Sequence, residues 1–101
     1  MNKLEMAIKE CSQGNYSEGK VLLLDLLNER PNSPSVLYNL GLCYSEINVL
    51  DKSVETLLKC VEIKPDFPNA YVALGYTLSQ QKKCYNSGVL KQLRAINHYS
   101  S

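Results

Sequence analysis

The sequence of 101 residues contains no tryptophan, a single phenylalanine, five glycines and four prolines. So few turn-forming residues favour helices joined by short connections over a β-sandwich, which needs many turns. The chain also lacks an excess of charge, because 11 lysines and arginines stand against 10 aspartates and glutamates. Without a net field, little attracts nucleic acid or an anionic membrane surface, and we expect neither as a partner.

Long apolar runs are missing as well. The longest, residues 21–27, is interrupted by Asp25 and is far shorter than the roughly 20 residues that a transmembrane helix needs. The first ten residues include Lys3, Glu5, Lys9 and Glu10, so they lack the apolar core of a signal peptide. These absences predict a cytoplasmic protein.

Residue groups that bind metals or perform catalysis are also absent from the sequence. The four cysteines, Cys11, Cys43, Cys60 and Cys84, form no CxxC pair, and His98 is the only histidine. We therefore expect reduced, packed thiols, with no metal site and no cofactor. There is no Gly-rich phosphate loop, zinc-protease helix motif or nucleophile elbow, which predicts a protein without enzymatic activity.

What the sequence does contain is an internal period of 34 residues. The clearest matches at this spacing are Pro31 with Pro65, Pro34 with Pro68, and Leu40-Gly41 with Leu74-Gly75. A small residue recurs in the same way, at Gly19, Ser53 and Ser87. We interpret the chain as one domain built from three copies of a single unit, at about residues 1–33, 34–67 and 68–101.

Each copy has the apolar spacing of two short amphipathic helices. In the middle copy, Leu37, Leu40, Gly41 and Tyr44 follow the spacing i, i+3, i+4, i+7 of one helical face. The predicted helices span residues 2–13, 17–29, 34–47, 51–63, 68–81 and 84–98. Their connections are short, so neighbouring helices should form three antiparallel pairs.

Prolines, glycines and an asparagine mark the ends of these helices. Pro34 and Pro68 suit the first turn of a helix, where a missing N–H costs nothing. Gly14 and Asn48 tolerate the left-handed backbone that ends a helix and turns the chain. In the third copy we place the turn at residues 80–83, with one inserted residue that restores the apolar register of helix 84–98.

Two glycines lie inside predicted helices. Gly41 and Gly75 each cost about 1 kcal/mol relative to alanine in a helix interior, so they require a packing reason. We expect the paired helix to pack closely against both.

The residue order of the middle copy resembles the tetratricopeptide repeat family. That order is Leu37, Leu40-Gly41, Tyr44, Ser53, Leu57, Cys60 and Pro65, and the resemblance covers essentially the whole chain. Leu37 and Tyr71 replace the family's usual tryptophan, and Ser53 and Cys60 replace its usual alanines. The resemblance implies an all-α fold, a right-handed α-solenoid of three helix-turn-helix repeats with six antiparallel helices. It also implies a concave groove lined by the first helix of each pair.

In such a groove, the side chains rotated off the buried face of each first helix would meet a partner. The candidate groove residues are Leu4, Ile8, Cys11, Tyr38, Asn39, Leu42, Ser45, Val72, Ala73, Tyr76, Ser79 and Gln80. This surface is apolar and aromatic with polar ends. We therefore expect a non-catalytic interaction module that binds an apolar or aromatic peptide or helix of another protein.

One well-known type of groove in this family, the carboxylate clamp, grips the acidic carboxy terminus of heat-shock chaperones with lysines, asparagines and an arginine. Asn39 matches one clamp position, but Leu4, Ile8, Asn69 and Ala73 stand where the clamp has its other polar and cationic residues. Without cations to offset the desolvation of a terminal carboxylate, we expect no binding to chaperone tails.

The last predicted helix leaves an alternative open. A solenoid needs a terminal unit with a polar outer face, yet this helix carries an apolar set with no further helix predicted after it. The set is Val89, Leu90, Leu93 and Ile96. The alternatives are a structural assembly element that self-associates into a homo-oligomer through this helix, or a fragment of a longer repeat protein.

Overall fold

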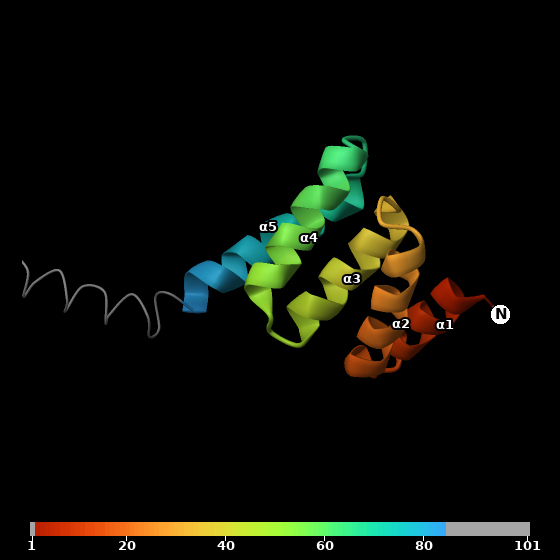
Figure 1. The fold of residues 1–101 in the computed structure, drawn as a ribbon. Coiled ribbons are helices and arrows are strands. Elements are labelled where there is room, and N and C mark those ends of the chain that lie inside the picture. The colour runs from red at the N-terminus through yellow and green to blue at the C-terminus, as the bar shows by residue number, and fades with distance from the viewer. Residues whose placement is uncertain (1, 85–101) are drawn as a thin grey trace, which may run out of the picture.

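The computed structural model describes residues 2–84, and within them the only regular secondary structure is α-helix. The helices are α1 (Lys3–Ser12), α2 (Tyr16–Glu29), α3 (Pro34–Glu46), α4 (Leu50–Ile63) and α5 (Pro68–Cys84). Each packs against the next, as Figure 1 shows from red α1 to blue α5. The first four lie within one residue of their predicted bounds, which confirms the all-α fold.

A sixth helix is predicted at residues 84–98. All of these residues except Cys84 lie outside the described residues. The apolar set proposed for self-association, Val89, Leu90, Leu93 and Ile96, also lies outside the described residues. The number of helices in the whole chain therefore stays a prediction.

Local sequence explains where α3 and α5 begin. Pro34 is the first residue of α3, and the Oγ atom of the preceding Ser33 accepts a hydrogen bond from the N–H of Val36 at 3.5 Å. Pro68 is the first residue of α5. Proline fits this place because first-turn N–H groups have no partner within the helix, so its missing N–H loses nothing.

The ends of α1 and α3 depend on residues with left-handed backbone. Gly14 has a φ of 87° and Asn48 a φ of 65°, as the sequence predicts. The residue 34 positions after Asn48 is Lys82, whose Cβ atom disfavours this conformation. The prediction of a turn at residues 80–83 is wrong, because α5 continues through them to Cys84.

Two neighbouring apolar clusters form the core. The first contains Ala7, Leu23, Leu26, Val36, Leu40 and Cys43, and the second contains Leu37, Cys60 and Ala70. Helices α1, α2 and α3 contribute to the first cluster, and α3, α4 and α5 to the second. Each pair therefore buries its apolar side against the next helix along, which is how repeat arrays maintain a continuous core.

Gly41 brings α3 and α4 together. A methyl group in place of its hydrogen would lie 2.6 Å from Leu57 Cγ, so the predicted close approach is confirmed here. At Gly75, no atom of the described residues lies within 4 Å of such a methyl group. Tyr71 and Leu78, on the same side of α5, are 48% and 46% exposed. The close approach predicted at Gly75 is thus absent from the described part of the chain.

The first helices of the pairs lie along one side of the molecule. Helix α1 contacts α3 and α3 contacts α5, whereas α2 and α4 have no contact with each other in residues 2–84. In a curved row, the helices that approach one another lie on the inside and those that diverge lie on the outside. Helices α1, α3 and α5 therefore line the concave side.

Candidate functional site

A pocket lies between α1 and α3. It has a volume of about 270 Å³ and is lined by Ile8, Cys11, Ser12, Tyr16, Asn39, Leu42, Cys43 and Glu46. Four of these are predicted groove residues, with Ile8 and Cys11 from α1 and Asn39 and Leu42 from α3. We call this hollow the α1–α3 pocket.

The lining of the α1–α3 pocket is mostly apolar and carries one charge. Ile8 is 43% exposed and Leu42 is half-buried, so both present apolar surface. The Nδ2 atom of Asn39 donates a hydrogen bond to the carbonyl of Ser35 at 2.8 Å, within its own helix. Glu46 is exposed and is the only charged residue of the lining. The pocket therefore suits an apolar side chain with a cation beside it.

Two sulfur atoms meet at this pocket. Cys11 Sγ and Cys43 Sγ lie 2.6 Å apart. Cys43 is 1% exposed, whereas Cys11 is half-buried. Burial, and next the hydrogen bond with Cys11, raises the pKa of the Cys43 thiol to about 12. Cys11, Cys43 and Cys60 are free thiols in the structure.

The predicted groove residues of α5 lie farther along the concave side. Val72 and Tyr76 are 72% and 56% exposed, so they offer the largest apolar surface there. Ser79 is exposed and Gln80 is half-buried. Ala73 is buried, at 8% exposure, and contributes almost no surface to a partner.

Three other predicted groove residues take part in packing. Leu4 lies against the first apolar cluster. The Tyr38 ring packs on Phe67, with centroids 5.1 Å apart and planes inclined by 36°. The hydroxyl oxygens of Ser45, on α3, and Thr77, on α5, lie 3.4 Å apart. These residues therefore contribute to contacts within the fold.

A buried hydroxyl pair behind the groove was not predicted. Ser53 Oγ donates to the Gly41 carbonyl at 2.7 Å, and Thr77 Oγ1 donates to the Ala73 carbonyl at 2.8 Å. The two hydroxyl oxygens lie 3.3 Å apart, and both residues are fully buried. The 34-residue period could have indicated that Thr77 is buried, because Thr77 follows the buried Cys43 by 34 residues.

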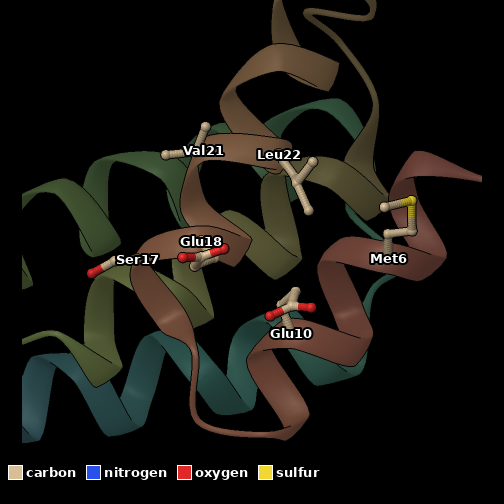
Figure 2. Close-up of a pocket in the computed structure, with 6 residues that line it drawn as sticks. All are labelled: Met6, Glu10, Ser17, Glu18, Val21 and Leu22. Carbon is tan, nitrogen blue, oxygen red and sulfur yellow. The ribbon is translucent and has the colours of Figure 1, made fainter.

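A second hollow, of about 520 Å³, lies between α1 and α2 and contains no predicted groove residue. Its lining, drawn in Figure 2, is Met6, Glu10, Ser17, Glu18, Val21 and Leu22. Met6 and Val21 are 44% and 63% exposed. The sequence could have indicated this exposed apolar surface, because the apolar run 21–27 is too long for all of its side chains to lie on one buried helical face. No residue of α3 or α5 lines this hollow, so it does not belong to the concave side.

Lys3, in the first turn of α1, has its charged partners on α2. Lys3 Nζ lies 2.7 Å from Asp25 Oδ2 and 3.3 Å from Glu29 Oε1, both on α2. Hydrogen bonds with Asp25 and then Glu29 raise the pKa of Lys3. No cation lines the pocket.

The model of one protein family, the tetratricopeptide repeat, matches residues 34–67. This segment begins at the first residue of α3 and ends just before α5, so it contains the pair α3–α4 with both of its turns. The chain contains a tetratricopeptide repeat. No curated protein matches the chain.

The tetratricopeptide repeat explains the arrangement of the described helices. Helix α3 is the first helix of the matched repeat and faces the groove, and α4 is its second helix. The pairing of α1 with α2 follows the same order, and together these helices form a helical-repeat solenoid. The number of repeats in the chain stays a prediction from the period.

Two general findings complete the description of the site. None of the helices in residues 2–84 combines the length and the apolar character required to span a bilayer. In the same residues, no three or more His, Cys, Asp or Glu side chains gather in a way that would hold a metal ion.

Proposed function

We propose that the concave side of this tetratricopeptide-repeat chain binds an apolar segment of a partner protein, with one apolar side chain of that segment in the α1–α3 pocket. Arrays of this kind act as protein-interaction modules through their extended concave surfaces. The observation that carries the proposal is the meeting of Ile8, Cys11, Asn39 and Leu42 in one pocket. Val72 and Tyr76 continue the apolar surface along α5.

The charge around the pocket supports a particular kind of segment. Glu46 is exposed at the rim, and no lysine or arginine lines the pocket. A lysine or arginine next to the apolar anchor would pair with this carboxylate, whereas a terminal carboxylate would find no cation in the lining. We propose an apolar residue flanked by a basic one as the recognised motif, and we expect acidic carboxy-terminal tails to bind weakly.

A displayed peptide library selected on the folded chain tests this proposal. We expect enriched peptides to share an apolar residue with a neighbouring lysine or arginine. Ile8→Ser and Val72→Ser should each reduce their affinity about tenfold, because a buried apolar side chain contributes about 1.5–3 kcal/mol. Affinity is measured by fluorescence anisotropy with labelled peptides.

Leu58→Ser is the matched control for these variants. Leu58 is 49% exposed, much like Ile8, but lies on α4 behind the groove. Its substitution should leave peptide affinity unchanged, while circular dichroism verifies that all three variants fold. Loss of binding in Leu58→Ser with retention in Ile8→Ser would overturn the proposal.

A structural assembly role is the second candidate. The observation that favours it is the apolar face of α5, where Tyr71 and Leu78 are about half exposed on either side of Gly75. Under this alternative, Tyr71→Glu with Leu78→Glu lowers the association constant of the chain in sedimentation equilibrium. A monomer at every concentration of the unmodified chain would exclude it.

A further inference from the structure

We propose that Cys11 and Cys43 form a dithiol site, which a peroxide oxidises to a reversible disulfide joining α1 to α3. The two residues are 32 apart in sequence, and the fold brings their Sγ atoms to 2.6 Å. The S–S bond of a disulfide is about 2.05 Å long. The two sulfur atoms are therefore already close to bonding distance.

The environment of Cys11 makes the site reachable from solvent. Cys11 is half-buried and lines the α1–α3 pocket. Its sulfur rests on Gly19 of α2, where a methyl group would overlap the Sγ atom. Cys11 is thereby held beside Cys43 on one side and open to the pocket on the other.

Cys60 differs from Cys11 in having neither access to solvent nor a neighbouring sulfur atom among the described residues. It is fully buried, and its Sγ atom faces the carbonyl of Pro34 at 3.4 Å. Burial raises the pKa of its thiol. No second sulfur lies within hydrogen-bonding distance of it in residues 2–84, so we expect Cys60 to remain a packing residue.

The next pair of first helices contains the same contact without sulfur. Ser45 and Thr77 follow Cys11 and Cys43 by 34 residues each, and their hydroxyl oxygens lie 3.4 Å apart. The contact between first helices therefore forms with hydroxyl groups as well. Packing of α1 against α3 therefore does not require thiols, and the two cysteines add redox reactivity to this contact.

The oxidation has two balanced steps. Cys11 reacts first, because it is accessible, whereas Cys43 is buried and the pKa of its thiol is raised to about 12. Cys11 Sγ attacks the peroxide, the O–O bond breaks, and a sulfenic acid and one water form. Cys43 Sγ then attacks this sulfur, the S–O bond breaks, and the hydroxyl leaves with the Cys43 proton as a second water.

Peptide mapping of the folded full chain tests the proposal. After equimolar hydrogen peroxide and trypsin, we expect residues 10–20 linked to residues 21–52, because trypsin does not cleave between Arg30 and Pro31. Dithiothreitol should separate the two peptides. The link should form at least about tenfold faster in the folded chain than in urea, since folding holds the sulfurs together.

The double variant Cys11→Ser with Cys43→Thr is the matched control, because it copies the contact of Ser45 with Thr77. It should fold, form no linked product and keep the buried Cys60 thiol reduced under the same treatment. The single variant Cys43→Thr should accumulate a sulfenic acid at Cys11 that dimedone traps, whereas the unmodified chain gives little adduct.

Three results would overturn the proposal. One is equal rates of disulfide formation in the folded and unfolded chain. Another is oxidation of Cys11 to sulfinic acid with no linked peptide in the folded chain. The third is equal dimedone trapping with and without Cys43. None of these readouts depends on what the groove binds.

Discussion

Gly41 and Gly75 occupy the same position of the repeat but have different surroundings. At Gly41 the side chain of Leu57, which is fully buried, leaves no room for a methyl group. At Gly75 no described atom limits the space. The same residue type therefore has a packing role on α3 and, within the described chain, only a backbone cost on α5.

Alanine substitutions separate these two situations. Gly41→Ala should destabilise the fold by about 1–2 kcal/mol, because overpacking outweighs the gain in helix propensity. Gly75→Ala should stabilise it by about 0.5–1 kcal/mol, because only the propensity gain remains. Urea unfolding measures both. Destabilisation by Gly75→Ala would contradict this expectation and indicate that a further helix packs there.

Burial of the Cys43 thiol also gives a pH dependence. The pKa of this thiol rises from 9.0 to about 12 on folding, so the native state keeps a proton that the unfolded chain releases. Stability is therefore fully present below pH 9 and falls between pH 9 and 12, by at most about 1.4 kcal/mol per pH unit.

Comparison with Cys43→Thr isolates this effect from other titrating groups. The difference in free energy of unfolding between the two chains should shrink from pH 8 to pH 10.5, as urea titrations at each pH would show. A constant difference over that range would contradict the assigned pKa.

At the scale of the helices, most boundaries followed from a few residues. Proline at the start of α3 and of α5, and Gly14 and Asn48 in the turns, fixed four helix ends to within one residue. The end of α5 could not be found in this way, because the period of the chain suggested a turn while the residue at the decisive position is Lys82. A local conformational preference prevailed over the repeat.

Asn48 offers a direct test of this argument. Its φ of 65° is unfavourable for a residue with a Cβ atom and no compensating side-chain polarity. Asn48→Ala should destabilise the fold by about 1 kcal/mol, and Asn48→Gly should be neutral or slightly stabilising. Thermal unfolding by circular dichroism measures both variants, and equal effects of alanine and glycine would refute the explanation.

At the scale of the whole molecule, the sequence indicated which helices are the first of each pair but not how much surface each of their side chains presents. Ile8, Leu42, Val72 and Tyr76 present surface. Tyr38 also packs on Phe67, which lies in the turn between α4 and α5. Such contacts depend on how pairs stack, which the apolar pattern of one helix does not contain.

The stacking of the helices also determines how far a destabilising substitution affects the rest of the molecule. Each helix contacts only nearby helices, so repeat arrays lose structure locally. Leu23→Ala, which removes a fully buried side chain at the first cluster, should cost about 2–4 kcal/mol. Amide hydrogen exchange should accelerate strongly in α1, α2 and α3 and less in α5. Equal acceleration in all five helices would instead show a single cooperative unit.

The contact of α1 with α3 and of α3 with α5, without one between α2 and α4, has a mechanical consequence. A row of rods fastened along one edge is stiff at that edge and compliant at the other. Bending this molecule therefore spreads its back while the fastened edge acts as the pivot, with the side-chain bridges Cys11–Cys43 and Ser45–Thr77 along it. Spreading the back in this way would curve the concave side more tightly around a bound segment.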